Sequence, residues 1–371
     1  MKVTVVGAGN AAIFTALNYA ASFKDDSGYE IELIHDPTIA PEIVGQATFQ
    51  SVPATLYQTL GFNWYNNPIH ATPKSGILYE GFGKKNDKWF HPFPADNMAM
   101  HFCPSEMQKY VLNSGYFKVI ESNILDPNDI DADYVFDCRG KPTDFTDYDE
   151  LINPTNACIL AKPNWDTTEA FWSRHVATPN GWTFVIPTHK DSPSHDYCVG
   201  YCYNRYITSK EDAEKNMLEM FDVEIKKHIP YKNYIAKNIA NDRIILNGNR
   251  LFFLEPMESS AVEAYTQVSR RAHYSLLTNQ FGDSTMIEEI REFIHQTQHF
   301  ILWHYQFGSK YDTPFWDYAK SLYVAEDSYF TECFLNLIKD NWPVEEYGQR
   351  EYGNWIGTSI KNWYDGMVDS D

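Results

Sequence analysis

The first seventeen residues read Met1-Lys-Val-Thr-Val-Val-Gly-Ala-Gly-Asn-Ala-Ala-Ile-Phe-Thr-Ala-Leu17. A short apolar run leads into a glycine turn, and a helix-forming run follows. Gly7 allows the tight turn, Gly9 allows close approach of the backbone to a pyrophosphate, and Ala12 allows the helix to pack closely on the strand. The positive end of that helix would face the phosphates. The stretch therefore predicts a dinucleotide site in an α/β fold, and a glycine turn without ligand is the alternative.

A second strand, predicted over 29–36, ends in His35 and Asp36. In dinucleotide-binding folds an acid at the end of this strand meets the ribose. His35 occupies the position of the usual glutamate, and Asp36 follows it. The residues that we expect to bind the cofactor in these two turns are Gly7, Gly9, Asn10, Ala11, Ala12, His35 and Asp36.

The amino-acid composition limits the kinds of partner that the protein could bind. The 371 residues include 25 Tyr, 23 Phe and 10 Trp, enough for a large core and for pockets with aromatic walls. Acidic residues outnumber Lys plus Arg by 50 to 30, which gives a formal charge of −20. Such a charge argues against binding to nucleic acid or to an anionic membrane.

The six cysteines lack the pairwise spacing of a secreted disulfide framework, so we expect core thiols. They are at positions 103, 138, 158, 198, 202 and 333. We expect no metal site, because no Cys or His pair completes a set of four ligands. His295 and His299 are interpreted as the polar face of a helix. With no signal peptide and no run of 18 apolar residues, the sequence predicts a cytoplasmic protein.

The order of predicted elements places the nucleotide-binding pieces far apart in the chain. They are the first strand and turn, a returning strand over 133–140, and a return at 248–261. Alternating segments over 157–161, 181–187 and 197–203 predict a separate sheet between them. Helices are predicted over 54–60, 105–112, 211–226 and 284–305.

This layout favours an α/β fold of the flavin-monooxygenase type. It combines a Rossmann-like FAD-binding sheet, an inserted mixed β-sheet layer and a C-terminal helical region. We expect residues 1–290 to form a discontinuous FAD-binding module with an inserted substrate sheet. Residues 291–371 would form a helical region packed on the same unit.

Five stretches, in order along the chain, carry a resemblance to a known family. They are Val44-Gly-Gln-Ala-Thr48, Thr72-Pro-Lys74, Trp182-Thr-Phe-Val-Ile-Pro187, Phe253-Leu-Glu-Pro-Met-Glu-Ser-Ser-Ala261, and Phe300-Ile-Leu-Trp-His-Tyr305 with Asp312-Thr-Pro-Phe-Trp316. The third resembles a W-x-W-x-I-P signature in which Phe184 replaces the second tryptophan. Together they resemble the flavin-dependent halogenases of the tryptophan-halogenase-like family, and they leave a phage-encoded member open.

The resemblance implies an enzyme that uses FADH2, O2 and a halide (chloride, bromide or iodide). These generate hypohalous acid, which travels through a tunnel to an electron-rich aromatic substrate. A separate flavin reductase would supply the FADH2, and a homo-oligomer is compatible with the sequence. Lys74 would hold the oxidant and steer it, because desolvation readily lowers the pKa of a lysine. Glu258 would accept the proton lost from the ring or orient the oxidant.

The resemblance also assigns the remaining site residues. Backbone amides at the start of a helix would bind halide: Ser259, Ser260 and Ala261. The tunnel wall would be Trp182, Phe184, Ile186 and Pro187. Further cofactor contacts would come from Val44, Gly45, Gln46, Ala47, Gly248 and Asn249.

Other interpretations remain open from the residues alone. Lys74 could be a solvated loop lysine like Lys88, and Glu258 an acid that complements a helix dipole. The Trp182 strand could be plain core, and the helix start an ordinary cap. A flavin monooxygenase that hydroxylates directly would need neither Lys74 nor the tunnel. A non-catalytic scaffold would bind FAD without turnover.

Overall fold

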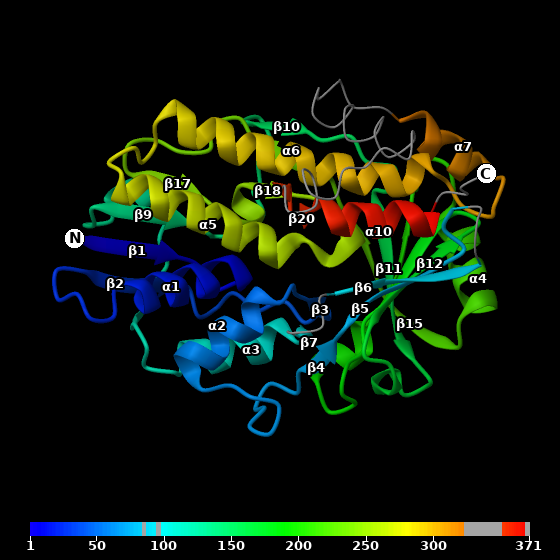
Figure 1. Ribbon diagram of the computed structural model, residues 1–371, viewed down its shortest axis with the longest axis horizontal. Helices are drawn as coiled ribbons and strands as arrows, with labels where there is room; N and C mark the ends of the chain where they lie inside the picture. The colour runs from blue at the N-terminus through cyan, green and yellow to red at the C-terminus, as the bar shows by residue number, and fades with distance from the viewer. Residues whose placement is uncertain (84–86, 94–97, 323–350, 368–371) are drawn as a thin grey trace.

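A computed structural model describes residues 1–83, 87–93, 98–322 and 351–367 of the chain. Two sheets lie toward opposite ends of the molecule, and long helices run along both of them (Figure 1). The N-terminal strand β1 belongs to the sheet at one end, and the green strands of the middle of the chain form most of the other. The helices and sheets share one large buried apolar core, and a smaller cluster of Val6, Ile130, Val135 and Ile244 lies at the first sheet.

The first sheet is parallel throughout and has the strand order β17-β9-β1-β2-β8. Its strands are β1 (Lys2–Val6), β2 (Glu30–His35), β8 (Lys118–Glu121), β9 (Tyr134–Asp137) and β17 (Ile244–Leu246). Val3, Val5 and Leu33 are fully buried, as expected for a sheet covered on both faces. The order with β1 in the centre is that of a Rossmann-like nucleotide-binding sheet, which confirms this part of the predicted fold.

The second sheet has seven strands in the order β15-β11-β14-β13-β12-β5-β6. They are β5 (Gly76–Glu80), β6 (Lys88–Pro92), β11 (Ala157–Pro163), β12 (Ser173–Thr178), β13 (Gly181–Val185), β14 (Val199–Tyr203) and β15 (Val223–Pro230). All neighbours pair antiparallel except β5 and β12, which are parallel. The predicted inserted mixed sheet is therefore present, and it also takes in β5 and β6 from the segment before it.

A third, small sheet has three short strands, which come from residues 46–102. It consists of β3 (Gln46–Ala47), β7 (Ala99–Phe102) and β4 (Thr72–Lys74), with β7 in the centre. Gln46 pairs with Phe102, and Lys74 pairs with Ala99. The predicted cofactor segment at 44–47 and the predicted catalytic lysine are thus held on one hydrogen-bonded unit.

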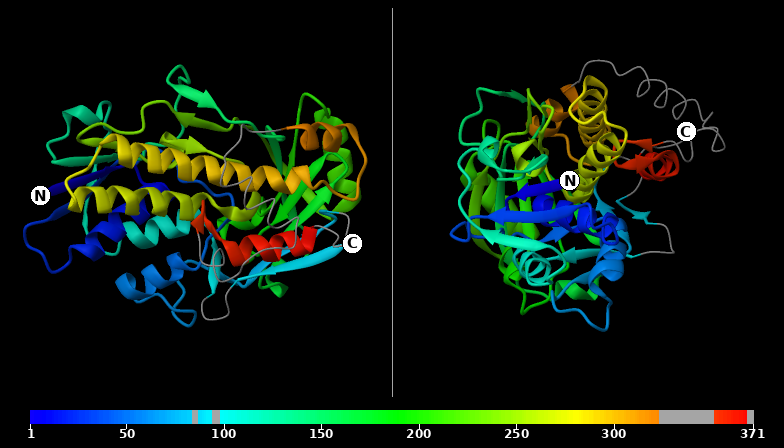
Figure 2. Two further views of the ribbon diagram at one scale, coloured as in Figure 1. Left: turned by 45° about the horizontal axis from the view of Figure 1, so that its top comes forward. Right: turned by 90° about the vertical axis from the view of Figure 1, so that its left-hand side faces the viewer.

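Helices cover the sheets, and α5 and α6 lie next to each other along the molecule in both views of Figure 2. The helices are α1 (Asn10–Ser22), α2 (Ser51–Leu60), α3 (Pro104–Leu112), α4 (Lys210–Met220), α5 (Ala261–Leu277), α6 (Ser284–Gln306), α7 (Pro314–Ser321) and α10 (Gly357–Met367). The predicted helix over 211–226 is wrong beyond Met220. Residues from Val223 form β15 instead, because they extend along β11 as its antiparallel partner.

Cysteines 103, 138, 158, 198 and 202 are free and buried, as expected for core thiols, and Cys333 lies outside the described residues. In the described part of the chain, no helix is both long enough and apolar enough to span a bilayer. The division of the chain at residue 290 stays a prediction. Helix α6 runs without interruption through that position and packs on α5.

Candidate active site

The predicted dinucleotide cradle begins where β1 ends. Gly7 has φ of +119°, and a Cβ there would collide with the carbonyl oxygen of Cys138, so only glycine fits this turn. The Nε2 group of Gln108 donates to the Ala8 carbonyl at 2.8 Å and fixes the loop from the side. Gly9 then caps α1, and its missing Cβ points into open space. The turn therefore leaves the backbone amides at the start of α1 free for close approach by a ligand.

The segment 248–261 begins next to this same turn. Gly248 has φ of +64°, and a Cβ on it would collide with the Cβ of Ala11. The Asn249 side chain accepts from the Tyr265 hydroxyl at 2.8 Å. At the start of α1, the Oδ1 atom of Asn10 is buried without a partner among the described residues. Small residues, a helix N-terminus and an orphaned polar atom at one place fit a dinucleotide such as FAD.

The end of β2 differs from the usual ribose-binding pattern. His35 is the last residue of β2 and is half-buried. Asp36 Oδ1 accepts from the amide and hydroxyl of Thr38, at 2.8 and 2.6 Å. These hydrogen bonds lower the pKa of the Asp36 carboxyl and hold it in a local turn. Its Oδ2 atom is the one left for a ligand.

We expect Gly9→Val to separate cofactor binding from folding. Its backbone, with φ of −71° and ψ of 177°, suits valine, and the Cβ meets nothing within 4 Å. The free energy of unfolding without cofactor should change by less than about 0.5 kcal/mol. FAD affinity should fall at least about tenfold, because the side chain occupies the space of the phosphates. Thermal melting and fluorescence titration with FAD measure the two effects. Unchanged FAD affinity would contradict this placement, and Gly7→Ala, which should lower stability itself, is the control.

The segment 44–47 lies against the strand of the predicted tunnel. A Cβ on Gly45 would touch the Ile186 side chain and the Thr188 hydroxyl, both at 3.4 Å. The Thr72 hydroxyl donates to the Pro187 carbonyl at 2.8 Å, two residues before Lys74. The residues that follow β13 thus lie close to the predicted cofactor segment and are hydrogen-bonded to the strand of the predicted catalytic lysine.

Lys74 is fully buried, which excludes the solvated-loop interpretation. Its Nζ atom has no hydrogen-bond partner among the described residues and lies 5.0 Å from the centre of the Phe93 ring. Burial lowers the pKa of Lys74 to about 7, and the opposing charge of Glu258 limits the shift. A substantial share of Lys74 is therefore a neutral amine near pH 7, with a lone pair available for chemistry.

Burying this amine should cost stability, and the cost should depend on pH. Between pH 7 and 10.5 the unfolded chain holds a proton on Lys74 that the folded protein lacks, so stability rises with pH across this window. We expect Lys74→Met to raise the free energy of unfolding by at least about 1 kcal/mol at pH 7, with the gain shrinking toward pH 10. Melting at several pH values measures this. Lys88→Met, at an exposed lysine paired with Glu80, should show no such trend.

Glu258 is 1% exposed and is held by three side chains from distant parts of the chain. The Tyr79 hydroxyl donates to its Oε1 atom. His304 Nε2 lies 2.9 Å from Oε1, and Trp355 Nε1 donates to Oε2 at 3.1 Å. Because His304 Nδ1 donates to the Phe300 carbonyl, a proton must lie between His304 Nε2 and Glu258 for that contact to be attractive. Glu258 is therefore a buried carboxyl that shares a proton with His304.

The backbone at Glu258 is strained in a way that favours anion binding. Glu258 and Ser259 have φ of +68° and +56°, which cost about 1–3 kcal/mol each. Ser260 then returns to the right-handed region before α5 starts at Ala261. Such a change from left-handed to right-handed backbone conformation points successive N–H groups toward one side, as in anion-binding concavities. The Ser259 amide already donates to the Pro256 carbonyl at 3.0 Å, which leaves Ser260 and Ala261 as the predicted halide donors.

One acid near these amides was missed from the sequence. Glu263 lies in the first turn of α5 and is 6% exposed. Its carboxylate accepts from the Ser51 hydroxyl and from Gln267 Nε2, the latter at 2.9 Å, and Arg270 lies 3.7 Å away. These partners engage its charge, which reduces its competition with an anion at the start of α5.

The predicted tunnel residues Trp182, Phe184, Ile186 and Pro187 are all buried. Trp182 and Phe184 lie on the same face of β13, with ring centres 6.0 Å apart. The aromatic ring of Phe184 lies directly over Gly200, where a side chain would leave it no room. Of these four residues, Ile186 lies next to Gly45 and Pro187 is hydrogen-bonded to Thr72 of β4.

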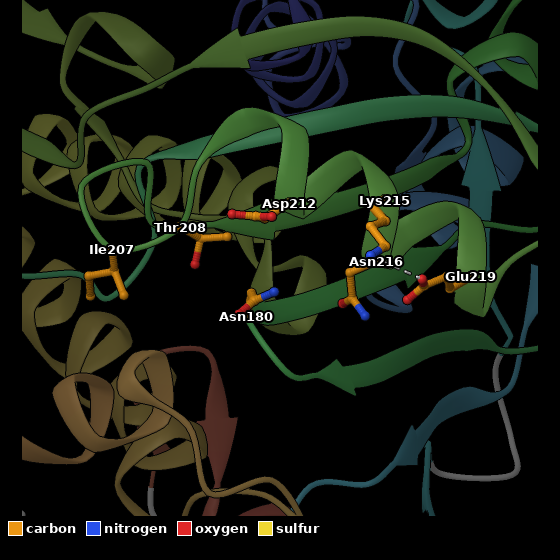
Figure 3. A pocket seen from close by; sticks show the side chains of 7 residues that line it. All are labelled: Asn180, Ile207, Thr208, Asp212, Lys215, Asn216 and Glu219. Atoms are coloured by element: carbon orange, nitrogen blue, oxygen red, sulfur yellow. Dashed lines mark ion pairs between the residues drawn. The ribbon is translucent and has the colours of Figure 1, made fainter.

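A separate surface hollow of about 310 Å³ lies over α4 and contains none of the predicted site residues (Figure 3). Its lining is polar and includes Asn180, Asp212 and Asn216, with Lys215 and Glu219 forming an ion pair at 4.0 Å. In the described part of the chain, no group of three His, Cys, Asp or Glu residues could hold a metal ion. His299, expected on a polar face, is instead buried, with Nδ1 3.2 Å from the Tyr352 hydroxyl.

A family model described as tryptophan halogenase matches residues 2–118 and 124–350. The chain belongs to the tryptophan halogenase family. The tryptophan 7-halogenase RebH of Lentzea aerocolonigenes is 26% identical over 257 residues, which cover 61% of this chain and 45% of that protein. The tryptophan 6-halogenase ThaL of Streptomyces albogriseolus is 21% identical over 327 residues, which cover 76% of this chain and 60% of that protein.

Solved structures show the same fold. Tar14, described as a tryptophan C-6 flavin-dependent halogenase (chlorinase) from taromycin biosynthesis, superposes with a TM-score of 0.76 at 17% identity, covering 99% of this chain and 91% of its own. The matched region spans about half the length of the two sequence relatives. For this member of the tryptophan halogenase family, activity must therefore be argued from its own residues.

Proposed function

We propose that this protein is an FADH2-dependent halogenase that acts on an electron-rich aromatic substrate through Lys74. The observation that carries the proposal is the Lys74 amine, which is buried, without a partner among the described residues, and partly neutral near pH 7. It lies within the electrostatic influence of Glu258, the carboxyl that the family resemblance pairs with it. FAD, bound in reduced form and supplied with O2, would provide the two-electron chemistry that oxidises a halide to hypohalous acid.

The residues of this chain would hold each component in turn. The glycine turn at 7–9 and the return at 248–249 would bind the cofactor, together with 44–47. The amides of Ser260 and Ala261 would bind the halide. Trp182 and its neighbours would exclude a bulky substrate from the cofactor, so that only a small oxidant passes.

At the far end, Lys74 would hold the hypohalous acid by hydrogen bonding to its oxygen, or would carry the halogen on its amine. Either role directs the electrophile toward one ring position. Glu258 would then accept the proton that the halogenated ring loses, while the proton already shared by the pair stays on His304. A separate flavin reductase and a small aromatic substrate are the partners in this scheme.

One set of incubations tests the proposal against its alternatives. The protein is combined with FAD, a flavin reductase, NADH and either chloride, bromide or iodide, with indole and phenol as probes. Mass spectrometry should find halogenated products. Hydroxylated products would favour a flavin monooxygenase instead, and bound FAD without any product would favour a non-catalytic scaffold.

A further inference from the structure

His175 is a buried histidine with no hydrogen-bond partner for either ring nitrogen. It lies in β12, near the middle of the seven-stranded sheet, and its exposed fraction is zero. Both Nδ1 and Nε2 are without partners among the described residues. A neutral imidazole has one donor and one acceptor, and leaving a buried polar group unpaired costs about 1–3 kcal/mol.

Neighbouring histidines do not share this property. His101 has Nδ1 3.1 Å from the Thr72 hydroxyl and Nε2 3.0 Å from the Ser173 hydroxyl. His91 Nε2 lies 2.8 Å from the Ser359 hydroxyl, so that only its Nδ1 lacks a partner among the described residues, whereas His175 has none at either nitrogen. The unpaired ring of His175 is therefore not a general feature of buried histidines in this region, and it indicates a position that meets a ligand.

His175 lies between residues of the predicted tunnel wall and Tyr79, which contacts Glu258. Across the sheet it pairs with Phe184 on one side and with Tyr79 on the other. Its ring centre is 4.9 Å from that of Trp182 and 5.2 Å from that of Tyr79, which it meets edge-on. Tyr79 is the residue that donates to Glu258. His175 thus contacts the first residue of the tunnel motif and the residue that holds the carboxyl.

The charges facing His175 keep its ring neutral. Burial lowers the pKa of His175 well below its usual value, and the charges of Lys74 and His304 lower it further. A neutral imidazole can donate one hydrogen bond and accept another. A small molecule that offers both an O–H donor and an oxygen acceptor suits such a ring.

We propose that His175 is a further catalytic residue that hydrogen-bonds hypohalous acid between the tunnel wall and Lys74. This inference rests on the proposed function, since it requires that the oxidant forms in the enzyme. In this role His175 accepts a hydrogen bond from the O–H group of hypohalous acid or donates one to its oxygen, and it keeps the oxidant from leaving before it reaches Lys74. The ring itself undergoes no covalent change.

The test compares His175→Phe, which keeps an aromatic volume without polar atoms, with His175→Asn, which keeps a donor and an acceptor. Three quantities are measured: O2 consumed, halogenated substrate formed, and halogenation of an added cyclic 1,3-diketone that traps free hypohalous acid. For His175→Phe we expect unchanged O2 consumption, about tenfold less halogenated substrate, and more trapped oxidant. His175→Asn should recover part of the loss. His228→Phe, at a half-exposed histidine on the edge strand β15, is the matched control.

Several results would overturn the inference. One is the wild-type ratio of product to O2 in His175→Phe. Another is a loss of O2 consumption in step with product, since His175 would then act before the oxidant forms. Equal losses in both variants with lowered melting temperatures would assign His175 a structural role. Failure of the proposed function itself looks different, because wild type would then halogenate neither the substrate nor the trap.

Discussion

Replacing Lys74 with alanine should abolish halogenation while the upstream chemistry continues. We expect the rate of haloproduct formation to fall by about 10²–10⁴-fold, the range typical of a group that acts directly on the reacting atoms. FAD binding and O2 consumption should stay within about twofold of wild type, because the cofactor contacts lie in other segments and truncation of a buried lysine leaves no unpaired charge. The oxidant would still form, but nothing would hold it at the substrate.

The measurement is a parallel assay of O2 consumption and haloproduct by mass spectrometry, with the same flavin reductase in each reaction. Lys74→Arg should not restore activity, because a guanidinium keeps its proton and its planar group does not fit the same space. Lys88→Ala, at an exposed lysine at the start of β6, should behave as wild type. Full haloproduct formation by Lys74→Ala would refute the proposed mechanism.

Replacing Glu258 with glutamine should have the second-largest effect. The amide preserves size but cannot accept the ring proton, so we expect about 10²-fold less haloproduct. The variant also removes the negative charge that raises the pKa of Lys74, so the Lys74 pKa should fall below about 7. Haloproduct rates and the pH dependence of chemical labelling at Lys74 measure the two effects.

Glu255→Gln provides a matched control three residues away. Glu255 is equally buried, and burial raises its pKa to about 7, so it already carries a proton in much of the population. Its carboxyl is bound by the hydroxyls of Thr155 and Tyr305, away from the Glu258 contacts. We expect Glu255→Gln to keep haloproduct formation within about threefold of wild type. If both glutamine variants lose activity equally, the specific role of Glu258 as a proton acceptor is wrong.

The parts of the fold that follow from local rules were predictable from the sequence. Gly7 and Gly9 belong to a turn whose backbone geometry dictates the residue type, so the first strand and helix were placed correctly. The predicted helix over 211–226 was too long because its second half forms β15, and only pairing with the distant strand β11 stabilises that conformation. Periodicity within the segment contains no information about such a partner.

Some residues of the candidate site could likewise be predicted from the sequence, and others could not. Lys74 and Glu258 could be proposed because family motifs mark them. Tyr79, His304 and Trp355, which hold Glu258, come from positions spread over most of the chain, and no local pattern links them. His175 gave no signal at all, because a single histidine in an alternating strand is typical of a sheet interior. The observation that identifies it is that neither ring nitrogen has a hydrogen-bond partner, and only the three-dimensional structure shows this.

The three-stranded sheet β3–β7–β4 has a consequence for changing this protein by mutation. The distance between the 44–47 segment and Lys74 depends on main-chain hydrogen bonds through β7, so it is largely independent of which side chains β7 carries. Libraries that vary the aromatic and histidine side chains around Lys74 should therefore reshape the proposed substrate site without altering the distance from the 44–47 segment to Lys74. Insertions or deletions in these three short strands would change that length and are best kept out of such libraries.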